Sequence, residues 1–380
     1  MQKIKIPKNR IRKLRSLSLG DNENCFEKFN LAGFKEKLID LCSNDYFGLS
    51  RDKDVIEAAY KSSLKEGLGS GSSLFISGLR PIHNDLENEL AKWLNREKIL
   101  LFPSGFQANI AAVGALANRN SIVIADKLIH NSLLTGIKTS GAKLIRFTHN
   151  NLADLESKLS KLNHEKSLLV IIETLYSMEG SLAPLNKIIN LCIKYNAQLL
   201  VDEAHALGVV GKEGKGLSYL LNDPIKVISG TFGKSFGSGG AFLACDKSIG
   251  EKIIQTSGPF KYTTALSPTL AAGALFSLKK IKNNKNWGKD LLAFSSKWKK
   301  EIMNCTNYLV KGDCHILSII IGSEEDTLAM QKYLEENGFL AVAIRPPTVP
   351  IGQSRIRITI KKTLTNEILN NFTKVLKNYK

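Results

Sequence analysis

The sequence has no apolar run that approaches the roughly 20 residues a helix needs to cross a bilayer. Its six cysteines are scattered, and no two of them form a Cys-x-x-Cys pair. Its six histidines show no His-Glu-x-x-His or other metal-ligand spacing. These absences argue against a membrane-spanning protein, a disulfide framework and a zinc site. They predict a cytoplasmic protein with reduced thiols and no bound metal.

Acidic residues are also few, because 35 Asp and Glu stand against 53 Lys and Arg, for a net charge of +18. One interpretation of this surplus is a nucleic-acid or membrane partner. The other is a set of lysines dispersed over a globular surface. The second is favoured because no long basic block is interleaved with aromatic residues. We therefore expect neither nucleic acid nor membrane as a partner.

The N-terminal stretch is basic, and its first twenty residues contain no acid. A transit peptide is one interpretation, but the stretch has no serine before Ser16. We expect instead a helical arm of the mature protein, within an N-terminal segment of residues 1–44. The apolar content of 43% and charged content of 23% are typical of a soluble globular chain. A chain of 380 residues can form one large and one smaller domain.

Short apolar runs alternate with helical patterns between residues 45 and 283. An amphipathic helix is expected after Pro81, and an Ala-rich helix from Gly105 to Ala117. Strands are expected at residues 99–102, 121–125, 168–173, 198–202, 227–229 and 241–244. This alternation predicts an α/β fold with a mainly parallel sheet in the large domain, and a ligand site at the carboxyl ends of its strands.

The glycine density falls after about residue 283, which predicts a smaller α+β domain over residues 284–380. Within it we expect a strand at Ile316–Ile321, a helix around Ala329–Asn337 and a final strand and helix.

Lys234 lies on a Gly-rich turn, Ser229–Gly237, that follows an expected strand, and Asp202-Glu203-Ala204-His205 ends another. A lysine amine can bind an aldehyde cofactor covalently. A buried carboxylate can keep a pyridine ring protonated, so that the ring withdraws electrons. The two motifs together predict pyridoxal 5'-phosphate (PLP) as the cofactor.

The same letters have a rival interpretation, since Asp-Glu-Ala-His is a helicase box and Gly233-Lys234-Ser235 resembles the end of a P-loop. A P-loop also requires a glycine five residues before Gly233, and Ile228 stands there. The lysine motif moreover follows the acidic box, in the reverse of the helicase order. The helicase hypothesis fails on both counts.

Each candidate residue also has a structural explanation when it is taken alone. Gly105-Phe106 could bind phosphate at a helix N-terminus or simply form a turn, and Thr231 could do the same. Asp202 could cap a loop, and His83 near a helix start is ambiguous. His149, His164 and His315 are expected at the surface or in packing. The prediction of a PLP site depends instead on the whole set in its order along the chain: Gly105, His130, Ser177, Asp202, His205, Thr231 and Lys234.

A strand is expected at Ser354–Ile360, where alternation places Arg355, Arg357 and Thr359 on one face. An arginine in such a place can bind a carboxylate through two parallel hydrogen bonds. The alternative is an ordinary amphipathic edge strand.

These motifs together resemble the α-oxoamine synthases, PLP enzymes of fold type I that join an amino acid to an acyl thioester with loss of CO2. The resemblance runs from about Leu41 to Lys361 and includes Cys42–Leu49 and Gly69–Ser73. It implies that Lys234 forms the Schiff base, Asp202 pairs with the ring nitrogen, His205 contacts the ring's phenolic oxygen and His130 stacks on the ring. It further implies that the cofactor is surrounded by Gly105, Phe106, Ser177 and Thr231. It implies a homodimer in which Thr264 reaches the phosphate of the partner subunit's cofactor. Substrate would be bound by Asn44, His130, Thr348 and Arg357.

Within the family, Ala343–Pro350 is most similar to the biotin-pathway member. That member condenses L-alanine with pimeloyl-CoA, or its acyl-carrier-protein form, to give 8-amino-7-oxononanoate, CO2 and a free thiol. A glycine C-acetyltransferase is the alternative within the family. The family also has a substrate-binding N-terminal arginine, a role that Arg10, Arg12 and Arg15 share as candidates.

Overall fold

The computed structural model describes residues 6–21, 24–29, 35–162 and 167–379. Its contacts divide the chain into two compact units. The larger unit comprises Leu49–Tyr176 and Leu182–Lys289, and the smaller unit comprises Met1–Gly48, Ser177–Ser181 and Asp290–Lys380. The expected domains over residues 45–283 and 284–380 stay a prediction. In this division the N-terminal stretch groups with the C-terminal residues.

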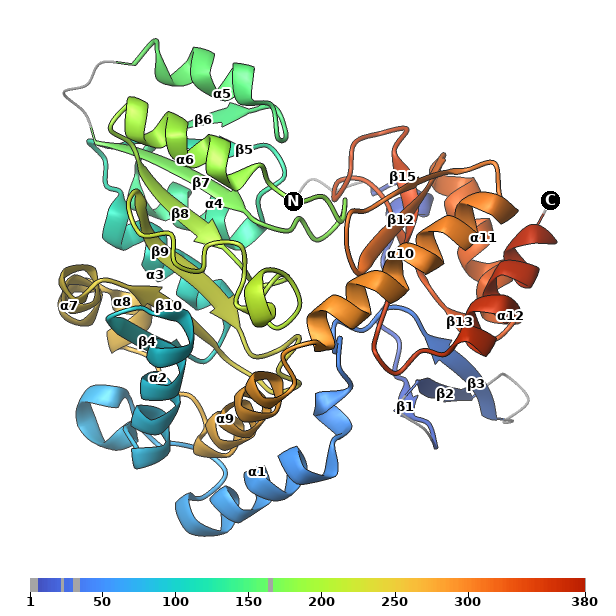
Figure 1. Ribbon diagram of the computed structural model, residues 1–380, viewed down its shortest axis with the longest axis horizontal. Coiled ribbons are helices and arrows are strands. Elements are labelled where there is room, and N and C mark those ends of the chain that lie inside the picture. The colour runs from blue at the N-terminus through green and yellow to red at the C-terminus, as the bar shows by residue number, and fades with distance from the viewer. Residues whose placement is uncertain (1–5, 22–23, 30–34, 163–166, 380) are drawn as a thin grey trace. The chain divides into compact units, whose positions relative to one another are not determined.

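The larger unit is built on a seven-stranded sheet of order β4-β10-β9-β8-β7-β5-β6 (Figure 1). Strands β9, β8, β7, β5 and β6 run parallel, whereas β10 is antiparallel to both of its neighbours. The strands are β4 Lys98–Phe102, β5 Ile122–Asp126, β6 Lys143–Phe147, β7 Leu168–Glu173, β8 Gln198–Asp202, β9 Ile225–Thr231 and β10 Ala241–Cys245. The predicted α/β class with a mainly parallel sheet is confirmed.

Helices precede and follow these strands, as the sequence pattern predicts. They are α1 Lys53–Glu66, α2 Pro81–Leu94, α3 Gly105–Leu116, α4 Asn131–Ser140, α5 Leu152–Leu159, α6 Leu185–Lys194, α7 Lys247–Thr256, α8 Gly258–Lys261 and α9 Pro268–Asn283, with short turns η2 Leu49–Arg51, η3 Leu74–Gly78 and η4 Lys212–Gly214. Side chains cap several of them, since Asp52 accepts from two N–H groups of α1 and Ser104 from the Gln107 N–H of α3. None of the helices in the described ranges is long and apolar enough to cross a membrane.

The core of the larger unit lies between the sheet and α3. All six residues of β7 are buried, and Leu169 and Ile171 belong to the same apolar cluster as Ala108 and Ala112 of α3. Each large apolar side chain buried in this way contributes on the order of 1.5–3 kcal/mol. The small alanines bring α3 close to the sheet, so its N-terminus is held firmly beside the strand ends.

Among its described residues the smaller unit contains two four-stranded sheets, of order β1-β2-β3-β13 and β11-β12-β15-β14. Their strands are β1 Ser18–Leu19, β2 Cys25–Phe29, β3 Lys35–Asp40, β11 Leu309–Lys311, β12 Ile316–Gly322, β13 Phe339–Leu340, β14 Val342–Ile344 and β15 Ser354–Thr359. Its helices are the turn η1 Lys8–Arg10, α10 Trp287–Cys305, whose first residues belong to the larger unit, α11 Glu324–Glu336 and α12 Asn366–Lys377. Strand β15 lies inside its sheet, so the edge-strand alternative is wrong.

The expected N-terminal helical arm is wrong for the residues from Ile6 onward. Only Lys8–Arg10 form a helical turn, of the 3-10 type, and Ile11 is already extended with φ −64° and ψ 129°. Residues 1–5 lie outside the described ranges. The segment leads into β1 and β2, because Ser18 and Leu19 pair with β2 instead of continuing a helix.

A buried ion pair joins Asp40, at the end of β3, to Lys361 in the smaller unit. The Lys361 Nζ lies 2.6 Å from Asp40 Oδ2, and the two side chains are only 3% and 4% exposed. Asp40 Oδ1 accepts from the backbone N–H groups of Cys42 and Ser43, at 2.8 and 3.0 Å. The pair therefore shapes the chain that leads from β3 to Asn44.

Replacing Lys361 by Met should lower the free energy of unfolding by about 3–5 kcal/mol, because it leaves the Asp40 carboxylate buried without its cation. The matched control is Lys61→Met, which removes an exposed pair with Glu57 and should cost less than about 0.5 kcal/mol. Urea unfolding followed by circular dichroism measures both. Equal midpoints for the two variants would contradict a structural role of the buried pair.

Candidate active site

Polar residues gather where three neighbouring parallel strands end. Glu173 ends β7, Asp202 ends β8 and Thr231 ends β9. They border a cavity of about 180 Å³ that is lined by Gly105, Phe106, Asn109, His130, Ser132, Glu173, Asp202, Ala204, His205, Thr231 and Lys234. The structure thus brings together the predicted residues Gly105, Phe106, His130, Asp202, His205, Thr231 and Lys234.

Lys234 is held by a loop that joins β9 to β10. Phe232 and Phe236 are fully buried and pack edge to face with ring centroids 5.6 Å apart. Backbone hydrogen bonds close the loop, from Ser238 N to Phe232 O and from Gly237 N to Lys234 O, both at 2.9 Å. Gly237 has φ +57°, and a Cβ there would meet the Ser50 backbone N at 2.2 Å. The anchoring on both sides fixes where the lysine leaves the backbone.

The Asp202 carboxylate is 5% exposed and has a donor on each oxygen. The Ala204 N–H donates to Oδ1 at 2.9 Å, and Asn109 Nδ2 donates to Oδ2 at 2.8 Å. These two hydrogen bonds fix the direction of the carboxylate. Glu203, the next residue, takes no part in the cavity, because its oxygens accept from Thr174 Oγ1 and Ser218 N. Burial raises the pKa of Glu203, which is an internal structural residue.

His130 and His205 approach the cavity from different elements. His130 caps α4, and Ser132 N donates to its Nδ1 at 3.3 Å. Burial lowers the pKa of His130; the charge of Asp202 raises it by a smaller amount, and Lys234 lowers it further. His205 follows β8 and is 7% exposed. The cavity therefore presents a neutral imidazole beside an acid and an amine.

The N-terminus of α3 and the Thr231 hydroxyl face a common space. A Cβ added to Gly105 would stand 4.0 Å from Thr231 Oγ1, in ordinary van der Waals contact, so the helix start and the hydroxyl are close neighbours. The Gly233 N–H donates to the same hydroxyl oxygen at 3.2 Å. N–H groups at a helix start and an adjacent hydroxyl are suitable donors for a phosphate.

The residues present fit PLP in the chemistry of their donors. Lys234 offers an amine, Asp202 a carboxylate fixed in orientation, His130 an imidazole and Gly105 with Thr231 an anion site. No further charged group is needed for these interactions. The fit rests on the cavity of the larger unit alone.

Three predicted residues, Ser177, Asn44 and Arg357, meet in the smaller unit. Arg357 Nε donates to the Ser177 carbonyl at 2.7 Å and its Nη2 to Asn44 Oδ1 at 2.9 Å. Its Nη1 donates to Thr359 Oγ1 at 3.1 Å, and Tyr46 is a further side-chain partner. Burial lowers the pKa of Arg357. The structure does not test the expected cofactor contact of Ser177.

The neighbouring arginine on β15 differs in its charge balance. Arg355 is also buried, but its Nη1 lies 3.1 Å from Glu179 Oε1. Among the ion pairs of the described residues, none involves Arg357. A buried guanidinium held by neutral oxygens is suited to receive a carboxylate from a ligand.

The structure separates the three N-terminal arginines. Arg10 pairs with Glu324, and Arg15 pairs with Glu335. Arg12 Nη2 instead donates to the exposed Thr348 hydroxyl at 2.7 Å. Burial lowers the pKa of Arg345; the charge of Arg12 lowers it further, and Glu324 raises it by a smaller amount. Arg12 is thus the one of the three that stands beside the predicted acyl-substrate residue.

The other predicted residues have plain surroundings. Thr264 is exposed in the loop before α9 and does not line the cavity. His83 Nδ1 accepts from Arg80 N, and its Nε2–H donates to Leu266 O, so it is a structural residue of α2. His149 donates to Asp126, and the His315 ring packs on Tyr46 with centroids 4.1 Å apart. His164 lies outside the described residues.

Sequence reasoning missed Asn109, Ser132, Glu173 and Ala204, which also line the cavity. Asn109 could have been found from its position four residues after Gly105, on the same side of an otherwise Ala-rich helix. Glu173 could have been found as the acid that ends an apolar strand. Ser132 gives no such indication in the sequence.

Comparison with known proteins agrees with this site. Residues 36–376 match the family model of aminotransferase class I and II. The chain belongs to this family. It is 36% identical over 343 residues, 89% of its length and 86% of the relative's, to an 8-amino-7-oxononanoate synthase of Hahella chejuensis.

Two solved structures share its fold. The 8-amino-7-oxononanoate synthase of Francisella tularensis superposes with a TM-score of 0.77 at 28% identity, covering 90% of this chain and 97% of that one. A serine palmitoyltransferase of Sphingomonas wittichii reaches a TM-score of 0.90 at 26% identity, covering 97% and 92%. Related serine palmitoyltransferase structures hold PLP. The chain is therefore a PLP-dependent enzyme of fold type I, and the predicted cofactor and enzyme class are confirmed.

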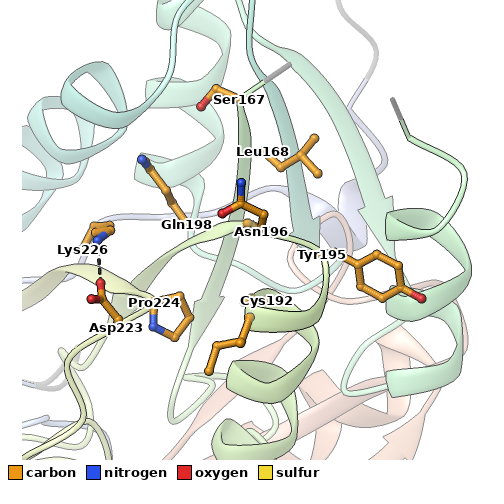
Figure 2. Close-up of a pocket in the computed structure, with 11 residues that line it drawn as sticks. Ser167, Leu168, Cys192, Tyr195, Asn196, Gln198, Asp223, Pro224 and Lys226 are labelled. Atoms are coloured by element: carbon orange, nitrogen blue, oxygen red, sulfur yellow. Dashed lines mark hydrogen bonds and ion pairs between the residues drawn. The ribbon is translucent and has the colours of Figure 1, made fainter. Parts of the chain in front are cut away.

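A second cavity, of about 620 Å³, lies near the other ends of the same strands (Figure 2). Leu168 and Gln198 begin β7 and β8 there. Lys226, near the start of β9, lies 2.5 Å from Asp223 Oδ1. The two lysines of β9 and its loop, Lys226 and Lys234, therefore differ in their surroundings and can be compared.

Replacing Lys234 by Ala should abolish catalytic turnover and the stable incorporation of PLP after borohydride reduction, because the reacting amine is lost. Lys226→Ala should retain both properties. Peptide mapping of the reduced protein and an assay of thiol release test the pair. A PLP label on any residue other than Lys234 would overturn the assignment.

Proposed function

We propose that the chain condenses L-alanine with a pimeloyl thioester, of CoA or of an acyl-carrier protein, to give 8-amino-7-oxononanoate, CO2 and the free thiol in biotin biosynthesis. The observation that carries the proposal is the cavity in which Lys234, Asp202 and His130 meet. Relatives named for this reaction support the choice of substrates.

Each residue of the cavity is assigned a separate role toward PLP. When bound, PLP supplies an aldehyde that captures amines and a protonated ring that accepts electrons. Lys234 would hold it and then move the proton at the substrate Cα. Asp202 would hold the proton on the ring nitrogen, His130 would cover the ring and His205 would contact its phenolic oxygen. Gly105, Phe106 and Thr231 would bind the phosphate.

The carboxylate of the amino acid is assigned to Arg357 and Asn44. The Arg357 guanidinium is held by the Ser177 carbonyl, Asn44 and Thr359, so its direction is set before a ligand arrives. Preorganisation of this kind lowers the entropic cost of binding. The incoming carboxylate supplies the negative charge that the buried guanidinium lacks.

The acyl substrate is assigned to Thr348 with Arg12, which takes the N-terminal role that sequence reasoning left open. Pimelate differs from ordinary fatty acyl groups in its second, terminal carboxylate. Arg12 donates to the Thr348 hydroxyl, and its charge acts on Arg345, so an anionic group beside Thr348 would be attracted by both cations. These cations support a dicarboxylic acyl group over a simple fatty one.

The protein is proposed to act as a homodimer. Helix α1 exposes Ile56, Tyr60 and Leu64, which recur every four residues on one face, by 52%, 60% and 71%. Phe75 and Ile76 are also exposed in the following turn. Apolar surface of this kind marks an interface. Thr264 would reach the phosphate of the partner subunit in such a dimer.

Two related reactions remain as alternatives. The serine palmitoyltransferases among the structural neighbours favour L-serine with a long fatty acyl thioester. A glycine C-acetyltransferase would use glycine with acetyl-CoA. A nucleic-acid-binding role stays disfavoured.

A substrate panel should show turnover with L-alanine and pimeloyl-CoA at least tenfold above L-serine with palmitoyl-CoA and glycine with acetyl-CoA. Release of thiol and of CO2 is measured for each pair, and the pimeloyl carrier protein is included. Faster turnover with serine and palmitoyl-CoA would reject the proposed substrates while leaving PLP dependence intact.

Replacing Arg12 by Ala should raise the KM for pimeloyl-CoA roughly tenfold, the loss expected for one hydrogen bond to a charged group. The KM for heptanoyl-CoA, which has the same length without the terminal carboxylate, should change less than twofold. Arg15→Ala is the control, since Arg15 pairs with Glu335. An equal effect of Arg12→Ala on both thioesters would show that Arg12 does not bind the terminal carboxylate.

A further inference from the structure

Asn109 connects the acid and the histidine of the cavity from inside the protein. It lies on α3 and is 3% exposed. Its Nδ2 stands 2.8 Å from Asp202 Oδ2 and 2.9 Å from Ser132 Oγ. Ser132, fully buried at the start of α4, stands with its Oγ 2.7 Å from His130 Nδ1. A continuous chain of hydrogen bonds therefore runs from Asp202 through Asn109 and Ser132 to His130.

The direction of each bond follows from its chemistry. A carboxylate only accepts, so the amide nitrogen of Asn109 must face Asp202. The second hydrogen of that nitrogen goes to Ser132 Oγ. Asn109 Oδ1 is buried and has no hydrogen-bond partner among the described residues. An unsatisfied buried acceptor is costly, so the amide is oriented for its two donated bonds at the expense of its oxygen.

The same reasoning fixes the form of His130. Ser132 N can only donate, so His130 Nδ1, at 3.3 Å, must be an acceptor without a proton. Since Asn109 donates to the Ser132 oxygen, the hydroxyl proton is free to point to Nδ1 as well. The proton of the neutral ring therefore lies on Nε2, the nitrogen away from this network.

We propose that Asn109 is a positioning residue that fixes the direction of the Asp202 carboxylate and, through Ser132, keeps His130 neutral with its proton on Nε2. The inference goes beyond the proposed substrates and rests only on the PLP cavity. Asn109 acts through Asp202 and Ser132 and is not assigned a contact with the reacting atoms.

The first test replaces Asn109 by Asp, which keeps the shape and removes the donor. At pH 8.5 the Kd for PLP, titrated into the cofactor-free chain, should rise about 10- to 100-fold, because two carboxylates then face each other. As the pH falls towards 6, the Kd ratio of variant to wild type should shrink, since a protonated Asp can donate to Asp202 as the amide does. This recovery at low pH distinguishes a donor from a residue that merely fills space.

The other titratable groups at the cavity are His130 from α4, Lys234 and His205 from their loops and Glu173 from β7. They are present in both proteins, so a pH dependence of the Kd ratio comes from the residue at position 109 and from its effect on these groups. The control Asn118→Asp places the same charge on an exposed residue just beyond the end of α3 and should leave the Kd unchanged. A Kd for Asn109→Asp within threefold of wild type at pH 8.5, or a ratio that does not vary with pH, would overturn the inference.

The second test replaces Ser132 by Ala and observes the imidazole nitrogens of the cofactor-free protein by NMR, with His130→Asn used to assign the signals. In the wild type, Nδ1 should report an unprotonated acceptor and Nε2 a protonated nitrogen. The Ser132→Ala variant should titrate His130 at higher pH than the wild type, since one donor to the neutral ring is lost.

An unchanged His130 titration in Ser132→Ala, or a proton on Nδ1 in the wild type, would overturn the Ser132 part of the inference. Neither test uses the acyl or amino-acid substrates. A failure of the proposed reaction would therefore appear in the substrate panel alone, whereas a failure of this inference would appear in cofactor binding and the histidine titration.

Discussion

The larger unit depends on one carboxylate being held in a single direction at the end of a buried strand. Strand β8 ends in Asp202, whose oxygens receive one backbone and one side-chain hydrogen bond. Burying a charged group without such partners costs free energy, because desolvation disfavours charge. The two donors fix the direction of the carboxylate, which could then face a positively charged ring nitrogen.

That arrangement requires parallel strands that end together. Strands β7, β8 and β9 are neighbours in register, so Glu173 pairs with Asp202, and Asp202 with Ser229. Lys234 lies on the loop after β9. Asn109 lies on α3, the helix that follows β4. Antiparallel strands would have sent alternate chain ends away from this edge. The fold thus determines which residues can meet.

Sequence patterns predicted the larger unit well because its strands are continuous apolar runs and its motifs follow them. They also predicted most of the cavity, since Lys234, Asp202 and Gly105 occupy strand ends and a helix start. They failed at the N-terminus, where Lys8–Arg10 form only a 3-10 turn and Ser18–Leu19 pair with β2 instead of continuing a helix, because strand pairing outweighs local propensity there. Ser132 could not be predicted from the sequence, since its role depends on a contact between its hydroxyl on α4 and the Asn109 amide on α3.

Pairs of identical residue types show how surroundings decide function. Arg355 and Arg357 are both buried on β15, but Glu179 neutralises only the first. A neutralised arginine holds the fold together, whereas an uncompensated one stores electrostatic energy that an anionic ligand releases. In the larger unit, Asp223 holds the amine of Lys226 near the start of β9, whereas the closed loop after β9 presents Lys234 to the cavity. Counter-charge, which no single-residue pattern reveals, therefore distinguishes Arg355 from Arg357.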